Sequence, residues 1–289
     1  TCSPASKPCL AGQSIYYYNG RVYIGTNYLA FGATPATNNE FHVYCVSDSS
    51  VPGCSPTTPV WMGSANVNHN INAIIVQGNY AYLATSNNAG EVMVYDVGNP
   101  ANMLLAGLFD ANRSANDEED GTSLFLLGHK LYVGRQTASN ANERDFYILD
   151  ISNPTRPVEL CSACSINLGS SISKNISGSA VTGLIVSGKY GFLALSDSNI
   201  GFLTLNISNP ATVYPIGPYN FSNDTTSVDF EDGFIFSSNI QNDALRIIRP
   251  AQCSDQVDDD DDGKIDVIDP ECSVNGIFNS EWDDESEAQ

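Results

Sequence analysis

The sequence predicts an all-β fold made of a repeated four-stranded unit, and three observations support this. Helix periodicity is nearly absent from the 289 residues. Two apolar runs joined by a glycine-containing turn recur as IIVQGNYAYLATS, LFLLGHKLYVGRQ and LIVSGKYGFLALS, which is typical of a β-hairpin. Each hairpin is followed by an apolar run, Asn-Pro and a second apolar run, as in EVMVYDVGNPANMLLAG, RDFYILDISNPTRPVEL and IGFLTLNISNPATVYPIG.

The turn glycines indicate five such units. They are spaced by 58, 50, 60 and 45 residues by subtraction, at Gly20, Gly78, Gly128, Gly188 and Gly233. The runs NAIIV, YAYLA and FLALS are apolar on both faces, so each sheet is expected to stack between two others. Repeated four-stranded sheets of this kind form a five-bladed β-propeller. The predicted domains are a propeller over residues 1–250, with blades at about 13–67, 70–111, 120–168, 178–221 and 225–250 plus 5–12, and an acidic segment over 251–289.

The last unit has three strands and then runs into the acidic segment, so one strand of the fifth blade is missing. CSPASKPCLAG near the N-terminus is similar to CSPTTPVWMG, the turn and fourth strand of the first unit. We therefore expect residues 5–12 to complete the fifth blade and close the ring. The alternative is that a neighbouring molecule supplies this strand, which would make the same segment a joint in a polymer.

The charge of the chain excludes some partners. The 33 acidic and 12 basic residues give a net charge of −21, which repels nucleic acid and anionic membrane surfaces. No apolar stretch approaches the roughly 20 residues needed to span a bilayer, and no signal peptide opens the chain. We expect a mature, exported protein.

The eight cysteines point to disulfides formed in an oxidising compartment, because each has a close neighbour in the sequence. Reduced thiols in a cytosolic chain are the alternative, and a zinc site at Cys161 and Cys164 is disfavoured because no second C-x-x-C exists. The suggested pairs are Cys2–Cys9, Cys45–Cys54, Cys161–Cys164 and Cys253–Cys272. Asn-x-Ser/Thr sequons, which mark possible glycosylation sites, occur at Asn112, Asn175, Asn206, Asn220 and Asn223.

The run CSDQVDDDDDGKIDVIDPEC is either a solvated acidic tail or a metal site. Calcium takes six to eight oxygen ligands, and a 12-residue loop can supply them from positions 1, 3, 5, 7, 9 and 12, with glycine at position 6. Gly263 stands at position 6 and Ile265 at position 8. The predicted ligands are Asp258, Asp260, Asp262, the Lys264 carbonyl, Asp266 and Asp269. This spacing predicts a calcium site, closed by a Cys253–Cys272 bridge.

Two family resemblances follow from these motifs. YDVGNPANMLLAG, ILDISNPTRPVEL and LNISNPATVYPIG resemble the LVIVD repeat, although Asn206 replaces the usual Asp and the fifth unit lacks Asn-Pro. That resemblance implies an exported or cell-surface protein of bacteria or archaea, usually without assigned chemistry. The acidic loop resembles thrombospondin type 3, dockerin and EF-hand-like calcium loops, with departures at Gln256, Asp259, Asp261 and Glu271.

The sequence favours a non-enzymatic function. Asp120, Asp224 and Asp229 are the carboxylates expected near the starts of inner strands. Asp120 ends a polar loop and Asp224 lies inside a sequon, so surface turns explain these two more simply than catalysis does. The histidines His42, His69 and His129 are scattered, and no nucleotide motif is present. We expect a calcium-stabilised surface protein that acts in adhesion or in assembly of a surface layer or filament, with a protein, a glycan or copies of itself as partner. The alternative is a secreted carbohydrate-active hydrolase that uses the propeller channel.

Overall fold

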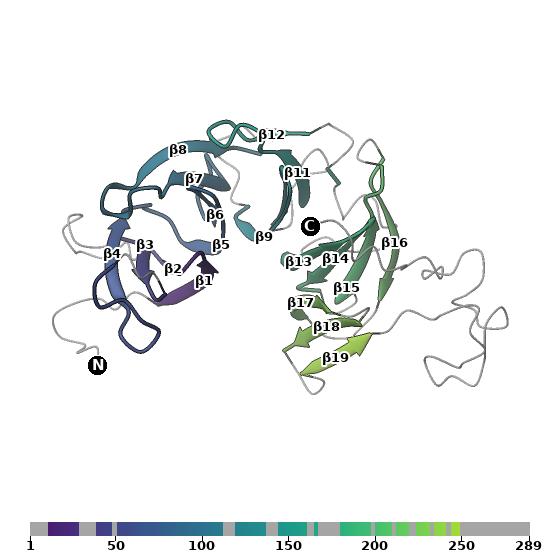
Figure 1. Ribbon diagram of the computed structural model, residues 1–289. Coiled ribbons are helices and arrows are strands. Elements are labelled where there is room, and N and C mark those ends of the chain that lie inside the picture. Colours follow the sequence, from purple (N-terminus) through teal and green to yellow (C-terminus); the bar gives the residue numbers. More distant parts are fainter. Residues whose placement is uncertain are drawn as a thin grey trace.

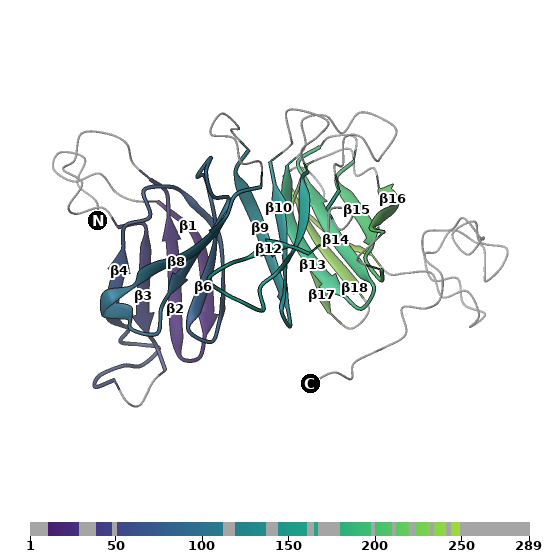
Figure 2. The ribbon, with the colours of Figure 1, turned by 90° about the horizontal axis from the view of Figure 1, so that it is seen from above.

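The computed structural model is an arc of five antiparallel β-sheets (Figure 1). It describes residues 11–28, 39–47, 51–111, 119–136, 144–160, 165–166, 180–197, 200–209, 212–219, 224–231, 234–240 and 244–248. Seen from above, the sheets stand side by side (Figure 2). The all-β prediction is confirmed, because the described residues contain strands and a single short 3-10 turn.

Each sheet is formed by consecutive strands, so the chain finishes one sheet before it begins the next. The first sheet contains β1 (Gly12–Tyr18), β2 (Arg21–Thr26), β3 (Phe41–Cys45) and β4 (Val60–Ala65). The second contains β5 (Ile71–Gln77), β6 (Tyr80–Thr85), β7 (Val92–Asp96) and β8 (Leu104–Phe109), with the turn η1 (Pro100–Asn102) before β8. The third contains β9 (Gly121–Leu127), β10 (Lys130–Arg135), β11 (Phe146–Asp150) and β12 (Val158–Glu159). The fourth contains β13 (Val181–Ser187), β14 (Tyr190–Leu195), β15 (Phe202–Asn206) and β16 (Tyr214–Tyr219). The fifth contains β17 (Thr225–Glu231), β18 (Phe234–Asn239) and β19 (Leu245–Ile248).

The first two strands of the first four sheets form the hairpins that the sequence predicts. Their turn glycines adopt left-handed backbone conformations that other residues rarely adopt, with φ of 77°, 60°, 59° and 51° at Gly20, Gly78, Gly128 and Gly188. Gly233, the fifth turn glycine, lies outside the described residues. The repeat of hairpins is therefore correctly predicted in these four sheets.

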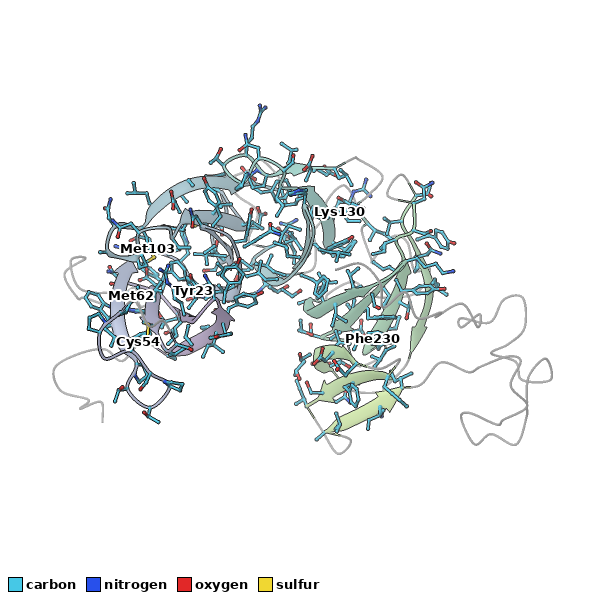
Figure 3. The ribbon with its side chains drawn as sticks, in the orientation of Figure 1. Tyr23, Cys54, Met62, Met103, Lys130 and Phe230 are labelled. Carbon is cyan, nitrogen blue, oxygen red and sulfur yellow. A yellow bond between two sulfur atoms is a disulfide. The ribbon has the colours of Figure 1, made fainter. Side chains whose placement is uncertain are left out.

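Apolar layers between neighbouring sheets form the core. Tyr23 and Met103 belong to the layer between the first and second sheets, and Phe230 packs into the layer between the fourth and fifth (Figure 3). The central strands β6 and β14 are buried on both faces, as the two-sided apolar runs predict. Each inner sheet therefore buries both of its faces, whereas each end sheet has one neighbour only.

At the first two sheet boundaries, the fourth strand of one sheet lies close to the Asn-Pro turn of the next, a contact that we call the Asn-Pro lock. A Cβ atom at Gly63 in β4 would overlap the Pro100 carbonyl of η1, and one at Gly107 in β8 would overlap the Thr155 carbonyl of the third sheet. A glycine in the fourth strand thus lets the Asn-Pro turn of the next sheet approach its backbone. This contact explains why the repeat carries both features.

The five sheets do not close into a ring. The first and fifth sheets lie on opposite sides of an opening (Figure 1), and no extensive contact joins them among the described elements. The fifth sheet has three described strands, as the sequence predicts. Ala11 and Gly12, which we expected in the fifth blade, instead pair with Asn27 and Thr26 in the first sheet. That part of the prediction is wrong, and residues 5–10 lie outside the described residues.

Candidate functional site

The first strand of each sheet, which we call its inner strand, contains a β-bulge near its start. These strands are β1, β5, β9, β13 and β17. The ladder skips the second residue of each inner strand: Gln13, Asn72, Thr122, Thr182 and Thr226. A bulge of this kind turns one side chain away from its own ladder. The side chain at the bulge, or that of the next residue in the strand, can therefore donate a hydrogen bond to the neighbouring sheet.

Four side chains at or beside these bulges donate hydrogen bonds to the next sheet. In each case the acceptor is the backbone carbonyl of the first residue of the next inner strand. Ser14 Oγ donates to the Ile71 carbonyl at 2.8 Å, and Asn72 Nδ2 donates to the Gly121 carbonyl at 2.8 Å. Thr122 Oγ1 donates to the Val181 carbonyl at 2.6 Å, and Thr182 Oγ1 donates to the Thr225 carbonyl at 2.5 Å. We call this contact the inner-strand joint. It recurs at all four sheet boundaries.

The two halves of a fifth inner-strand joint lie at the ends of the arc. Thr226 is exposed, and among the described residues its Oγ1 bonds Ser238 of its own sheet. Thr182 makes the same bond within its sheet, to Ala194, in addition to the bond to Thr225. At the other end, Gly12 is exposed, whereas its counterparts in the other four sheets are buried. The donor and the acceptor of a further joint are therefore both available.

The outward side of the first sheet is an apolar surface. The strand registers align Tyr17 with Val22, Tyr44 and Trp61, and Ile15 with Ile24 and His42. We call these seven residues the first end face. Ile15, Tyr17 and Trp61 are 71%, 60% and 58% exposed, which is high for large apolar side chains. Gly12, Ile24, Thr26, His42 and Tyr44 line an open depression on this face.

The outward side of the fifth sheet combines exposed apolar side chains with the carboxylates of Asp229 and Glu231. The registers align Asp229 with Phe236 and Ile247, and place Leu245 beside them. We call these four residues the fifth end face. Leu245 and Ile247 are 61% and 58% exposed. Val228, Ile235 and Ile248 point to the other side, where they pack against the fourth sheet. The arc therefore ends in two surfaces that expose apolar side chains, of which the fifth end face is also acidic.

A group of buried charges lies between the second and third sheets. Arg135 and Glu91 are almost fully buried, and Arg135 Nη2 lies 2.9 Å from Glu91 Oε1. Arg135 also donates to the Arg144 and Glu119 carbonyls and lies over the Tyr147 ring. Burial raises the pKa of the Glu91 carboxyl above its ordinary value, and Arg135 opposes this shift. This pair links the two sheets and is closed to solvent.

Buried acids at the start of the third strand have a structural role in the first two sheets. Glu40 Oε2 accepts hydrogen bonds from the Val67 and Asn68 amides, at 2.8 and 3.0 Å. Glu91 Oε2 accepts a bond from the Ala111 amide at 2.8 Å. In both cases the carboxylate holds the segment that leads from one sheet to the next.

The last residue of the third strand in the second, third and fourth sheets, three positions before Asn-Pro, accepts a hydrogen bond from the segment that follows. Asp96 and Asp150 accept hydrogen bonds from the amides of Gly98 and Ser152, at 2.9 and 2.8 Å. In the fourth sheet Asn206 Oδ1 accepts from both the amide and the hydroxyl of Ser208. An amide oxygen therefore replaces the carboxylate of the repeat motif without loss of the turn.

The structure describes few of the site residues that the sequence predicts. Asp258, Asp260, Asp262, Lys264, Asp266 and Asp269 lie outside the described residues, as do all the predicted cysteines except Cys45 and Cys54. Those two form a disulfide with a Cα–Cα distance of 5.7 Å, so this pairing is confirmed. Asn206 is half-buried at the end of β15, and the other four sequons lie outside the described residues.

Of the three carboxylates considered for catalysis, Asp120 lies at the third sheet, whereas Asp224 and Asp229 both lie at or in β17 of the fifth sheet. Asp120 precedes β9, where burial raises the pKa of its carboxyl and Arg135 opposes this shift, whereas Asp224 precedes β17. Asp229 is exposed and accepts a hydrogen bond from the Phe230 amide. Within the described ranges no three His, Cys, Asp or Glu side chains gather as a metal site would require. His42 and His69 are half-buried, and burial lowers the pKa of each imidazole.

The repeated sheets, inner-strand joints and Asn-Pro locks define an all-β repeat protein of propeller-like architecture. Three segments, at residues 70–111, 138–163 and 178–220, match the LVIVD repeat. The LVIVD resemblance of the sequence is therefore confirmed for these segments. No curated protein sequence matches the chain.

One solved structure with a TM-score above 0.5 supports the propeller-like architecture, and two further structures are less similar. A crystal structure of a nidogen–laminin complex aligns with a TM-score of 0.51 at 10% identity, over 82% of this chain and 75% of that chain. BamB from Moraxella catarrhalis aligns with a TM-score of 0.47 at 12% identity, over 82% of this chain and 56% of that one. The computationally designed protein Ika8 aligns with a TM-score of 0.47 at 13% identity, over 83% and 71% of the two chains. At these identities the likeness concerns the fold alone.

The described part of the chain has no helix with the length and apolarity that crossing a membrane requires.

Proposed function

We propose that this protein is a non-enzymatic, exported surface protein whose propeller-like body acts in assembly or adhesion and is stabilised by calcium. The observation that carries the proposal is the pair of end faces, both of which expose large apolar side chains. Surfaces of this kind mark protein interaction sites, because isolated soluble domains rarely expose large contiguous apolar patches. The partner of such a surface is a protein, and a second copy of this chain is the first candidate.

The rest of the body is suited to a structural role. Four inner-strand joints fix each sheet to the next, and Asn-Pro locks add to the first two boundaries. The Cys45–Cys54 disulfide closes the loop between β3 and β4. Disulfides persist in oxidising compartments, which supports export. The charged cluster around Arg135 is enclosed between sheets, so it serves stability better than catalysis.

Calcium belongs to the proposal because of the spacing between Asp258 and Asp269. Five aspartates and one carbonyl occupy the six ligand positions of a 12-residue calcium loop. In the absence of metal, adjacent carboxylates about 4 Å apart repel by about 1 kcal/mol per pair even in water. A divalent cation turns this repulsion into attraction, so the loop is expected to bind and to be ordered by calcium.

Electron microscopy of material sheared from cells that produce the protein tests the proposed function. We expect ordered polymers or layers that contain this chain. Monomeric protein that hydrolyses glycans would overturn the proposal and support the alternative, a secreted hydrolase.

A further inference from the structure

We propose that the fifth end face of one molecule docks onto the first end face of a second copy and completes a fifth inner-strand joint between them. The proposal rests on the proposed function, since it names the partner and the contact for assembly. Thr226 Oγ1 of one copy would donate to the Gly12 carbonyl of the other.

The four joints inside the chain define the geometry of this contact. In each of them, a side chain at or beside the bulge donates to the first residue of the next inner strand. Thr226 follows Thr225 as Thr182 follows Val181, and both threonines already bond the partner strand of their own sheet. Gly12 stands where Ile71, Gly121, Val181 and Thr225 stand in the other sheets. The contact between copies thus continues an interface that the protein already uses four times.

The side chains of the two end faces suit such a contact. Inside the arc, each joint is accompanied by an apolar layer between the two sheets. Ile15 and Tyr17 on one face, and Leu245 and Ile247 on the other, would form the corresponding layer. The fifth end face also carries the carboxylate of Asp229, and the first carries the hydroxyls of Tyr17 and Tyr44, which can donate to it.

A second copy fits this contact better than the chain's own opposite end. The four joints hold the two end faces on opposite sides of the opening (Figure 1). Because the two faces differ, the contact between copies is heterologous. A heterologous contact builds a ring where its rotation closes and an open polymer where it does not, so oligomers larger than a dimer are expected.

Purified full-length protein tests this contact by analytical ultracentrifugation over a range of concentrations. We expect the wild type to form a series of oligomers. The variant Ile15→Asp, on the first end face, and the variant Leu245→Asp, on the fifth, should each weaken association by about tenfold or more. Mixed together, these two variants should form dimers and no longer species, because each retains one intact face. Leu104→Asp in β8 is the matched control, since Leu104 is 59% exposed and lies outside both faces.

The possible outcomes separate this inference from the proposed function. Association that survives in both variants would overturn the contact while leaving assembly itself in place. Wild-type protein that stays monomeric at every concentration would overturn both the contact and the assembly role.

Discussion

Arg135 Nη2 lies 2.9 Å from Glu91 Oε1, and both side chains are almost fully buried between the second and third sheets. Arg135 ends β10 in the third sheet, whereas Glu91 precedes β7 in the second. The pair therefore links neighbouring sheets by a charged contact in addition to their apolar layer. Removing one partner of a buried pair leaves the other charge uncompensated in a medium that solvates it poorly.

We predict that Arg135→Leu lowers the free energy of unfolding by about 3–5 kcal/mol, because Glu91 then remains buried without its cation. Urea denaturation measures this change. Arg156→Leu, at an exposed position, is the control and should change stability by less than about 0.5 kcal/mol. The loss of stability in Arg135→Leu should shrink as the pH falls. A raised pKa in the folded state means that the folded protein binds the proton more tightly than the unfolded chain does, so protonation of Glu91 stabilises the fold as the pH drops through the folded pKa. Equal losses in both variants would contradict the prediction.

The approach of Gly107 to the Thr155 carbonyl predicts a steric effect. Gly107→Ala should lower the free energy of unfolding by about 1–3 kcal/mol, since the new methyl group would overlap the backbone of the third sheet. Gly191→Ala is the matched control, because a Cβ atom there meets its nearest neighbour at 3.7 Å. Thermal unfolding of the two variants compares them directly. If Gly107→Ala is as stable as Gly191→Ala, the Asn-Pro lock does not fix the sheets.

The sequence predicts the sheets well because their signals are local. A hairpin needs only two apolar runs and a glycine between them, so the units around Gly78, Gly128 and Gly188 are readable from adjacent residues. The glycine and the Asn-Pro pair also recur in the sequence, but their contact across a sheet boundary appears only in the structure. Local patterns therefore define the elements and leave their packing open.

Contacts between sheets are not predictable in the same way. Arg135 resembles an ordinary exposed charge in the sequence, and its partner Glu91 is 44 residues away by subtraction. The second strand of each of the first three sheets ends at Thr26, Thr85 and Arg135, respectively. Because the first two are threonines, the repeat itself does not predict an ion pair at this position. The joint donors Asn72, Thr122 and Thr182 are small polar residues of a kind common in strands and turns. Their shared position, second in each inner strand, is the signal that could have revealed them.

His42 predicts a pH effect on the first end face. Burial lowers the pKa of this imidazole below its usual value of 6.5, although the Asn39 backbone and the Glu40 carboxylate oppose the shift. Because the folded pKa is depressed, the contribution of His42 to stability is complete above about pH 6.5 and is lost as the pH falls towards the folded value. An NMR titration should give a midpoint below 6.5 for His42. A midpoint at or above 6.5 would show that the ring is not buried as described.

The calcium loop predicts a difference between aspartates that are adjacent in the sequence. Asp258→Asn with Asp260→Asn removes two predicted ligands, whereas Asp259→Asn with Asp261→Asn removes the same charge from positions that the spacing leaves outside the ion. We expect calcium to raise the melting temperature of the wild type and of the second double variant, and a chelator to reverse the rise. The first double variant should lose most of this response, because a calcium site depends on the number and charge of its oxygen ligands. If both double variants respond alike, net charge alone governs the effect, and the acidic run is a solvated tail instead of a calcium site.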